Sequence, residues 1–440
     1  MHISVIGTGY VGLVTGACFA EFGLYVTCMD ADSRRIAMLE KGEIPFFEPG
    51  LAELVAKGMK EHRLTFTTDF AKAVDQALVI FIAVGTPSRP DGSADLSYVD
   101  EVGRGIATHM TGYKVIATKS TVPVGTGERL RDVIKANQRE ECRFDMVSNP
   151  EFLREGSAIE DFLRPNRVVL GADSPQAVAI MSDLFRPLYL IETPFVVTDI
   201  PTAEMIKYAS NAFLATKVSF INEIANLCER VGANVQVVSK GMGLDHRIGS
   251  KFLHAGPGFG GSCFPKDLAA LIQTGEDAGS PMEIPKAAAR VNERQRDLMV
   301  DKIRMAVGGT FKGKTLALLG LSFKPNTDDL RDSPALAIAQ RLQESGSALR
   351  IYDPVALDQA LKKLPGAKSG IDVYATVEGA DAVVLLTEWN QFRNLELGRI
   401  KSSLKAPLFI DLRNVYEPDR MAKAGFRYVS VGRPDAKPEK

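Results

Sequence analysis

The sequence Ile-Ser-Val-Ile-Gly-Thr-Gly-Tyr-Val-Gly occupies residues 3–12 and decides the fold of the first part of the chain. Its first four residues form a short apolar run, rich in β-branched side chains, that predicts a buried strand. The glycine-rich turn that follows leads into a helical pattern, which extends through Phe22 and ends at Gly23. A second strand is predicted at Tyr25–Met29, directly before Asp30. This order of elements indicates the first βαβ unit of a parallel sheet.

The alternation of strands and helices continues through the first part of the chain. Further strands are predicted at Ala77–Val84, Lys114–Thr118, Phe144–Val147 and Arg167–Leu170. Because helical patterns separate these strands, they favour an α/β fold with one doubly wound, parallel sheet over residues 1–200. In such a sheet, ligands bind beyond the carboxyl ends of the strands.

The pattern changes at Pro201, where a block of helices begins. Thr202–Val231 is a long, mostly apolar helical stretch closed by Gly232, and three further helical segments precede Val307. We therefore assign residues 201–307 to a central helical domain. Such a block is equally typical of a dimerisation element and of a subdomain that packs only within its own chain.

Strands and helices alternate again from Lys314. The predicted elements are strands at Thr315–Leu319, Leu349–Tyr352, Asp381–Leu386 and Pro407–Ile410, with a helix at Ser333–Glu344. This second Rossmann-like region, residues 308–432, has only Gly320 where the first region has three glycines, so it would bind a nucleotide in a different way. Residues 433–440 are rich in proline and charge and are predicted to form a disordered tail.

Composition excludes several classes of protein. The net charge of −1 argues against a nucleic-acid-binding surface, and no apolar run reaches the length of a membrane span. The five cysteines are an odd number without a Cys-x-x-Cys pair, which favours a reduced, cytoplasmic protein, and the N-terminus shows no signal peptide. The five histidines have no metal-ligand spacing, so we expect no metal site.

The glycine turn, with the acidic residue that ends the second strand, indicates a dinucleotide site. Gly7, Gly9 and Gly12 permit the tight turn, the close approach of a pyrophosphate, and close packing of helix on strand. Asp30 is placed to accept hydrogen bonds from the adenosine ribose, and its charge would repel a 2′-phosphate. We therefore expect NAD rather than NADP, although Arg35 is a residue that can receive such a phosphate. The alternative is a doubly wound domain whose glycine turn binds nothing.

The segment Gly-Phe-Gly-Gly-Ser-Cys-Phe-Pro-Lys-Asp at residues 258–267 indicates a reactive thiol. Cys263 lies at the end of a glycine-rich turn, just before a predicted helix that has Pro265 near its start. The unpaired backbone N–H groups and the positive dipole end of a helix favour the thiolate. We expect Gly258, Gly260 and Gly261 to let the backbone approach a ligand closely. The alternative is that Cys263 is a small buried hydrophobic residue.

Lys207 and Asn211 lie four residues apart on the long predicted helix and therefore share one face of it. Their neighbours in the sequence are largely apolar. Burial would lower the pKa of the lysine towards that of a useful base, or its charge would stabilise a developing alkoxide. The alternative is a surface lysine whose ammonium reaches water from the edge of the helix.

Three further polar residues follow predicted strands. Thr121 lies in the loop after Lys114–Thr118, whereas Glu151 and Glu155 lie in the loop after Phe144–Val147. Since these loops leave the carboxyl ends of parallel strands, the three side chains are expected at the level of the reactive end of the cofactor. Ordinary capping of loops would explain each of them singly.

These residues together resemble the UDP-glucose/GDP-mannose dehydrogenase family, which oxidises the C6 alcohol of a nucleotide sugar to a carboxylate. The resemblance extends from the first strand into the last region and is greatest to the UDP-glucose branch of the family. The matching segments are 7–12, 84–87, 120–123, 149–156, 204–211, 245–249, 258–267, 321–334 and 387–392.

The resemblance implies a fold of two Rossmann-like domains joined by a long central helix, with NAD as cofactor, UDP-glucose as substrate and a homodimer as the assembly. It implies the catalytic residues Cys263 as nucleophile, Lys207, Asn211 and Asp267 around the reacting oxygen, and Thr121 and Glu151 for water and proton transfer. It implies the cofactor contacts Gly7, Gly9, Tyr10, Val11, Gly12, Asp30, Arg35, Thr86, Thr121, Glu155, Lys266 and Arg331. It implies the substrate contacts Glu151, Phe152, Leu153, Lys207, Asn211, Phe259, Gly260, Phe323, Lys324 and Arg413, with Arg247 reaching the substrate of the neighbouring subunit.

The chemistry that the resemblance implies is consistent with a thiol in the site. Oxidation of an alcohol to an acid removes four electrons, so two NAD molecules are needed in turn. Addition of Cys263 to the intermediate aldehyde gives a thiohemiacetal, whose oxidation gives a thioester that water cleaves to UDP-glucuronate. The alternatives are the same chemistry on GDP-mannose or a UDP-N-acetyl hexose, a two-electron hydroxyacid dehydrogenase, and an NAD-dependent binding protein with a silent site.

Overall fold

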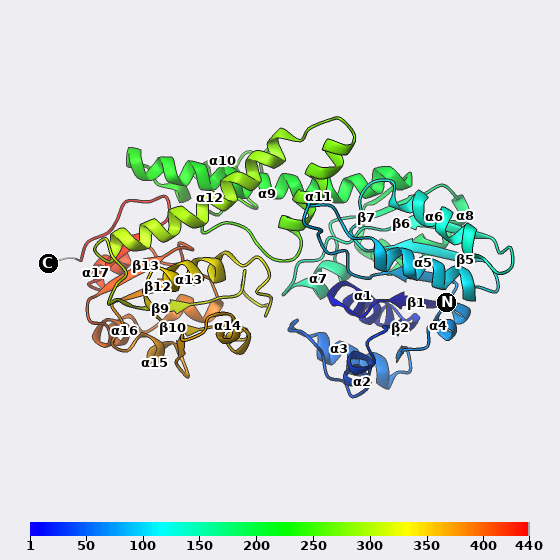
Figure 1. The fold of residues 1–440 in the computed structure, drawn as a ribbon, viewed down its shortest axis with the longest axis horizontal. Helices are drawn as coiled ribbons and strands as arrows, with labels where there is room; N and C mark the ends of the chain where they lie inside the picture. Colours follow the sequence, from blue (N-terminus) through cyan, green and yellow to red (C-terminus); the bar gives the residue numbers. More distant parts are fainter. Residues whose placement is uncertain (439–440) are drawn as a thin grey trace. The chain divides into compact units, whose positions relative to one another are not determined.

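The structure, a computed structural model, describes residues 1–438. The chain divides into two compact units. Unit one comprises Met1–Ser210 and Ala269–Pro281, and unit two comprises Asn211–Leu268 and the chain from Met282 onward. Each unit contains one sheet covered by helices on both faces (Figure 1).

The sheet of unit one has eight strands in the order β3-β2-β1-β4-β5-β6-β7-β8. The strands are β1 (His2–Ile6), β2 (Tyr25–Met29), β3 (Leu64–Thr67), β4 (Val79–Ile82), β5 (Lys114–Thr118), β6 (Phe144–Ser148), β7 (Val168–Ala172) and β8 (Phe195–Thr198). The first six strands have the order of a dinucleotide-binding fold, β3-β2-β1-β4-β5-β6. The order of the strands along the chain reverses between β1 and β4, where such folds bind their ligand. The prediction of a parallel sheet is confirmed except at one place, because β7 pairs antiparallel to β6 and parallel to β8.

Helices cover both faces of this sheet. They are α1 (Tyr10–Glu21), α2 (Ser33–Glu40), α3 (Leu51–Lys60), α4 (Phe70–Gln76), α5 (Ser97–His109), α6 (Thr126–Asn137), α7 (Ala158–Leu163) and α8 (Pro175–Leu184), with a 3₁₀ helix at Arg186–Ile191. Apolar residues of α1, α3, α7 and α8 form one core, and those of α4, α5 and α6 form the other. The sheet separates the two cores, because successive side chains of a strand point to opposite faces. In β4, Val79 and Phe81 belong to the first core, and Ile80 and Ile82 belong to the second.

Unit two contains a second sheet with the strand order β11-β10-β9-β12-β13-β14, in which every pair is parallel. The strands are β9 (Thr315–Leu319), β10 (Ala348–Tyr352), β11 (Lys368–Ser369), β12 (Ala382–Leu385), β13 (Leu408–Asp411) and β14 (Arg427–Ser430). The helices are α13 (Pro334–Glu344), α14 (Leu357–Lys363), α15 (Val373–Val377), α16 (Leu397–Ser403) and α17 (Pro418–Lys423), with a 3₁₀ helix at Asn390–Asn394. The predicted second Rossmann-like region is therefore confirmed.

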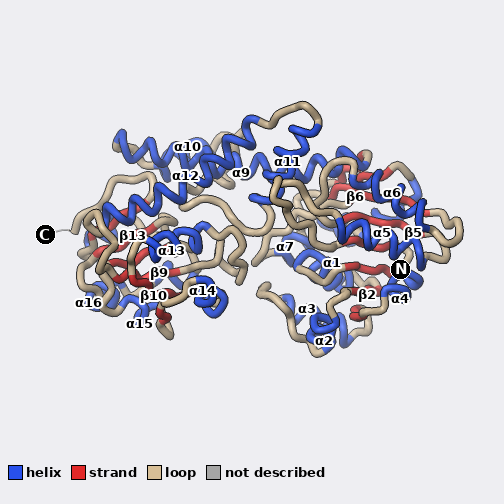
Figure 2. The backbone as a smooth tube through the Cα atoms, viewed as in Figure 1, coloured by secondary structure: helices blue, strands red, loops and turns tan. Residues whose placement is uncertain are grey.

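The predicted block of helices follows β8. It consists of α9 (Ile200–Val231), α10 (Val235–Gly243), α11 (Phe264–Asp277) and α12 (Glu283–Ala306). Helix α9 is a single helix of 32 residues, labelled in Figure 2. The boundary between the two units falls within it, after Ser210. None of the helices of residues 1–438 combines the length and the hydropathy needed to cross a membrane.

The prediction of a disordered tail from Arg433 is wrong for the part of the tail that the structure describes. The Arg433 side chain is fully buried and donates to the Tyr428 hydroxyl at 2.8 Å, and Ala436 pairs with Tyr428 through the backbone. Composition alone suggested a solvated segment, whereas a single arginine with buried acceptors orders its beginning. Residues 439–440 of the predicted tail lie outside the described residues.

Candidate active site

The three glycines of the turn between β1 and α1 have three different surroundings. A Cβ atom at Gly7 would lie 2.7 Å from the Ala83 carbonyl oxygen, and one at Gly12 would lie 1.9 Å from the Gly7 carbonyl oxygen. A Cβ atom at Gly9, in contrast, would meet nothing within 4 Å. Gly7 and Gly12 are therefore required by the protein's own packing. Gly9 keeps the space at the start of α1 open.

Asp30 follows β2 and receives four hydrogen bonds. Its carboxylate accepts from the Thr8 backbone N–H and hydroxyl, both at 2.8 Å, from the Asp32 N–H at 3.0 Å and from Arg35 at 3.1 Å. Burial alone would raise the pKa of Asp30, but these donors outweigh it and hold the pKa below its usual value. The site therefore presents an ionised carboxylate whose nearest cation, Arg35, is already paired with it.

These features fit NAD. Helix α1 begins at Tyr10 without a side-chain cap, so its N-terminal N–H groups are not taken by a residue of the cap, and Gly9 leaves room before them. The pyrophosphate would lie against Gly9 and the N-terminal N–H groups of α1, in the turn that Gly7 and Gly12 shape, and Asp30 would hold the adenosine ribose.

A buried ion pair joins α9 to the loop after β6. The Lys207 ammonium donates to the Glu151 carboxylate at 2.9 Å and to the Glu151 backbone carbonyl at 2.7 Å. Each side chain is 4% exposed. Burial would raise the pKa of Glu151, but the Lys207 charge and a 2.6 Å hydrogen bond from the Leu153 N–H hold it below its usual value. Lys207 therefore does not extend to water, and this alternative from the sequence is wrong.

Phe152 lies next to this pair. The Lys207 ammonium is 5.4 Å from the centre of the Phe152 ring, and the guanidinium of Arg167 lies 3.5 Å from it. The ring is thus in contact with two cations, which fixes its orientation. Four of the predicted residues, 151–153 and 207, are gathered here.

The sequence did not assign a role to Lys119, which lies in the same region. It is 4% exposed and donates to the Asn149 side-chain oxygen at 3.1 Å, and burial lowers its pKa to about 8. The Asn149 amide in turn donates to the Val169 carbonyl at 2.9 Å. The sequence did contain a signal for a buried lysine, because Lys119 directly follows the apolar strand β5, where a side chain is expected to be buried.

The loop that carries Thr121 is fixed from two sides. The Thr86 hydroxyl donates to the Thr121 carbonyl at 2.8 Å. The buried carboxylate of Glu204 accepts from the N–H groups of Gly125 and Gly127, both at 2.8 Å, at the start of α6. Glu204 is on α9, one turn before Lys207. Helix α9 therefore bonds to the loop after β5 through Glu204 and to the loop after β6 through Lys207.

Glu48 is a second residue that sequence reasoning missed. Its carboxylate accepts from the Tyr10 hydroxyl, from the Gly156 N–H at 2.5 Å and from the Ala158 N–H at 2.8 Å. The hydrogen bonds connect the glycine turn to the start of α7 and to the loop that contains Glu155. The signal was weak, since Glu48 lies in a segment without regular structure.

In unit two, Asn211 belongs to a chain of hydrogen bonds at the start of α11. Its amide donates to Asp267 at 2.6 Å, and Lys266 donates to the other carboxylate oxygen at 2.8 Å. The Asp267 N–H donates to the Cys263 carbonyl at 2.8 Å. Asp267 is 1% exposed, whereas Cys263 is partly exposed directly before the helix. Four predicted residues are thus connected, with the thiol at a helix N-terminus.

The glycines before Cys263 approach protein atoms rather than leave space for a ligand. A Cβ atom at Gly258 would lie 2.5 Å from the Asn292 side chain, one at Gly260 2.2 Å from the Asp332 carbonyl, and one at Gly261 2.7 Å from the Phe323 ring. The expectation of close approach is met, but the partner is the chain itself. The Asn292 amide also accepts from the Phe259 N–H at 2.8 Å.

The remaining predicted residues of unit two lie in three places. Lys324 lies over the Phe323 ring, which contacts Gly261, and the Arg331 carbonyl accepts from the Gly261 N–H at 3.0 Å. Arg413 donates to the Phe323 carbonyl at 3.0 Å. Arg247, in contrast, is 89% exposed and pairs with Asp245.

Arg413 lines a cavity of about 680 Å³ in unit two. Cationic and polar side chains from α10, from the segment between α10 and α11, and from the loops after β12 and β13 surround it, among them Gln236, Lys240, His254, Arg393 and Asn414. The cavity therefore lies beyond the carboxyl ends of parallel strands, where doubly wound sheets bind their ligands.

The sequence matches three domains of the UDP-glucose/GDP-mannose dehydrogenase family, namely the NAD binding domain over residues 1–189, the central domain over 201–294 and the UDP binding domain over 317–418. A UDP-glucose 6-dehydrogenase of Rhizobium meliloti is 53% identical to this chain, over 99% of it and 100% of that protein. The chain belongs to the UDP-glucose/GDP-mannose dehydrogenase family. The cofactor of this family's N-terminal domain is NAD, as the glycine turn and Asp30 predicted.

Other named dehydrogenases are also similar to this chain over more than nine tenths of their length. The UDP-glucose 6-dehydrogenase TuaD of Bacillus subtilis is 50% identical over 98% of this chain and 93% of that protein. Among solved structures, a UDP-glucose dehydrogenase of Pyrobaculum islandicum has a TM-score of 0.88 and 38% identity over 94% of each chain. A UDP-D-ManNAc dehydrogenase of Pyrococcus horikoshii has a TM-score of 0.85 and 28% identity, covering 98% of this chain and 99% of that one.

Proposed function

We propose that this protein oxidises the C6 alcohol of UDP-glucose to the carboxylate of UDP-glucuronate, with two NAD molecules consumed per sugar. The observation that carries this proposal is the partly exposed Cys263 at the N-terminus of α11, followed one turn later by the Lys266–Asp267–Asn211 chain. A thiol has no use in a two-electron alcohol oxidation but is the nucleophile that a second oxidation needs. The named UDP-glucose 6-dehydrogenases support the choice of sugar over GDP-mannose or a UDP-N-acetyl hexose.

The roles of the side chains follow from their surroundings. NAD, when bound, supplies the hydride acceptor. Lys207, held at Glu151, and Asn211, held at Asp267, are one helical turn apart on α9 and are proposed to donate hydrogen bonds to the C6 oxygen and to stabilise its negative charge. The Glu151 carboxylate that Lys207 contacts is proposed to accept the C6 proton.

Cys263 is proposed to form the covalent intermediate. Its thiolate sulfur adds to C6 of the aldehyde, and the resulting thiohemiacetal again carries a C6–H bond that can be oxidised. Oxidation gives a thioester, and water then attacks C6 and releases the sulfur as thiolate. Thr121 and Glu151 are proposed to position that water and to receive its proton, and Glu155 to contact the cofactor.

The stoichiometry of NADH tests this function. Purified protein with limiting UDP-glucose and excess NAD should form two NADH per sugar consumed, and Cys263→Ala should lose steady-state turnover by about a thousandfold or more. Cys142→Ala is the matched control, because it removes another partly exposed thiol, one that lies before β6 rather than at the start of α11. One NADH per sugar, or normal turnover of the Cys263→Ala variant, would exclude the thioester mechanism.

We also propose that the three sequence regions keep separate tasks. Residues 1–200 bind NAD, 201–307 form the dimerisation block, and 308–432 bind the nucleotide sugar. The family's domain boundaries support this division. A reducing, cytoplasmic location is supported by the five cysteines, since no disulfide links any of them within the described chain.

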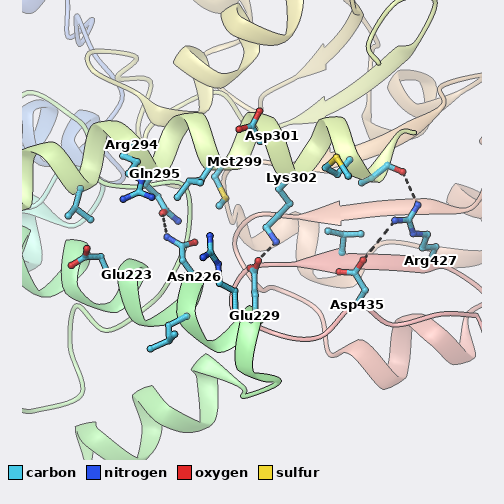
Figure 3. A pocket seen from close by; sticks show the side chains of 17 residues that line it. Glu223, Asn226, Glu229, Arg294, Gln295, Met299, Asp301, Lys302, Arg427 and Asp435 are labelled. Atoms are coloured by element: carbon cyan, nitrogen blue, oxygen red, sulfur yellow. Dashed lines mark hydrogen bonds and ion pairs between the residues drawn. The ribbon is translucent and has the colours of Figure 1, made fainter. Parts of the chain in front are cut away.

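The homodimer proposal is supported by exposed apolar residues on α9. Phe213, Phe220 and Leu227 follow one another at intervals of seven residues and are 65%, 46% and 54% exposed. Apolar residues at this interval form one stripe along a helix, as at helix–helix interfaces. Leu227 also lines a cavity of about 530 Å³ between α9, α12 and β14, where Lys302 pairs with Glu229 at 2.8 Å (Figure 3).

A second copy of the chain is the proposed partner of this stripe. Phe220→Glu or Leu227→Glu should convert the assembly to monomer, measured by sedimentation velocity at micromolar concentration. Ile371→Glu is the control, because this residue is 94% exposed and lies outside α9. A protein that remains dimeric with a charge in the stripe would show that another surface forms the interface.

A further inference from the structure

The sequence segment expected to be disordered supplies the most completely buried cation of unit two. The three nitrogens of the Arg433 guanidinium make five hydrogen-bond contacts, with acceptors on α10, on β14 and in the loop after β13. It donates to Ser430 at 3.1 Å, to Gln236 at 2.7 Å, to Asn414 at 3.3 Å, and to the Tyr416 carbonyl and Tyr428 hydroxyl at 3.1 and 2.8 Å. Only a planar fork of fixed geometry can bind this set of acceptors at once.

Two of these acceptors line the 680 Å³ cavity. Gln236 of α10 and Asn414 of the loop after β13 both face it, and Arg433 lies behind them. The Gln236 amide also donates to the Asn414 carbonyl at 3.2 Å. The guanidinium thus holds α10 and the loop after β13 at a fixed separation across one wall of the cavity.

The loop after β13 needs this support because its backbone is strained. Asn414 has a φ of 55°, a left-handed conformation that side chains rarely adopt. Its side chain is fixed at both ends to Val431, accepting from the N–H at 2.9 Å and donating to the carbonyl at 2.8 Å. Arg433 adds a charged donor to the same side-chain oxygen, so the strained residue is tied to the segment after β14.

Asp411 anchors the other end of this loop. The carboxylate is fully buried and accepts from the N–H groups of Arg413, Val415 and Tyr416 at 3.0, 2.8 and 3.0 Å. It also accepts from the Tyr428 hydroxyl at 2.8 Å, the hydroxyl to which Arg433 donates. Asp411 and Arg433 are therefore connected in one hydrogen-bond network through the Tyr428 hydroxyl. Arg413 lies in the loop between Asp411 and Asn414, which this network holds at both ends.

We propose that Arg433 is a positioning residue for the nucleotide end of the substrate site, acting through Gln236 and Asn414 on the cavity that Arg413 lines. The inference rests on the proposed function, in which residues 308–432 bind the nucleotide sugar, and it assigns the uridine diphosphate to this cavity. Arg433 is fully buried and does not line the cavity itself. Its loss therefore weakens binding of the nucleotide and leaves the chemical step unchanged.

The test measures UDP binding and turnover separately. Arg433→Lys keeps the buried charge but not the fork, and Arg433→Met removes both. Both variants should raise the Kd of UDP, measured by calorimetry, and the KM of UDP-glucose by about tenfold or more. The KM of NAD should stay as in the wild type, and kcat should change by less than about threefold.

Arg427→Met is the matched control. Arg427 lies on β14 near the same end of the chain and donates to the Ala306 carbonyl at 2.8 Å, but it does not line the cavity of Arg413. This variant should lose thermal stability without losing affinity for UDP. A merely structural role of Arg433 would give the same behaviour in both variants.

The outcomes separate the two proposals. If the wild type binds UDP and the folded Arg433→Lys variant binds it equally well, the positioning role is wrong and the proposed function stands. If the wild type does not bind UDP, the proposed function and this inference both fail. If Arg433→Met does not fold, the Arg433→Lys variant decides the question, because it retains the buried cation.

Discussion

Replacing Lys207 by methionine should leave Glu151 as an uncompensated buried charge. The two groups are 2.9 Å apart and 4% exposed, so at an effective dielectric constant of about 20 their attraction amounts to about 6 kcal/mol. Desolvation offsets part of this attraction, and loss of one partner of a buried pair costs about 3–5 kcal/mol. Hydrogen exchange of peptides covering residues 149–156 should show a reduction of this size in the free energy of opening.

The pH dependence of this effect has a defined sign. In the wild type the pKa of Glu151 is lowered, so the pair stays ionised at neutral pH. Without Lys207, burial raises the pKa of Glu151 above its unfolded value, and the folded state then binds a proton more tightly than the unfolded state does. Stability of the Lys207→Met variant should therefore fall as pH rises through that raised pKa, and recover in acid.

A double substitution tests the cause. Glu151→Gln combined with Lys207→Met removes the stranded charge and keeps an acceptor for the Leu153 N–H. The double variant should open less readily than Lys207→Met alone, with a difference of about 1.4 kcal/mol or more, a tenfold change in exchange rate. If the double variant is as unstable as the single one, an uncompensated charge is not the source of the instability.

Three further predictions concern other residues. Because Asp30 is ionised, kcat/KM with NAD should exceed that with NADP by at least about a hundredfold, and Asp30→Ser should narrow the ratio; equal efficiencies in the wild type would contradict the assignment. If Arg247 acts on the neighbouring subunit, a mixture of the Arg247→Ala and Cys263→Ala variants should regain some activity, because a mixed dimer contains one complete site. If the subunits exchange and no activity returns, Arg247 acts within its own chain. Since burial lowers the pKa of Lys119 to about 8, the unfolded state binds more protons between about pH 8 and 10.5, so the wild type should gain stability relative to Lys119→Met as pH rises across that window, and a pH-independent difference in unfolding would show an ordinary pKa.

The elements that the sequence predicted best are buried strands. The runs at Tyr25–Met29, Lys114–Thr118 and Thr315–Leu319 have the bounds observed, because strands covered on both faces are continuously apolar. Four strands were missed, namely β3, β8, β11 and β14, and all of them are short. They are the edge strands of the two sheets. Because an edge strand has a neighbouring strand on one side only, it need not be continuously apolar, and the pattern that marks the central strands is weaker there.

The candidate site was predicted where chemistry and local spacing coincide. Asn211 donates to Asp267, and the resemblance had assigned both of them to the surroundings of the reacting oxygen. Asp30 lies at the glycine turn, as the βαβ pattern indicated. Glu48 and Arg433 were not found, because each depends on partners far away in the sequence. Glu48 bonds to Ala158, 110 residues later, and Arg433 to Gln236, 197 residues earlier. Patterns of period two or 3.6 do not extend over such separations.

The reversed strand β7 determines where α9 leads. Gly171 of β7 pairs with Ser148, and a Cβ atom at Gly171 would lie 2.5 Å from Ala203, so α9 passes this glycine closely at the level where β6 ends. Since β8 runs opposite to β6, the chain that turns back after it travels in the direction of β6, and four residues beyond Ala203 it delivers Lys207 to Glu151. Had the last two strands been parallel to the others, the returning helix would have carried its lysine towards the amino ends of the strands, away from the loop that holds Glu151.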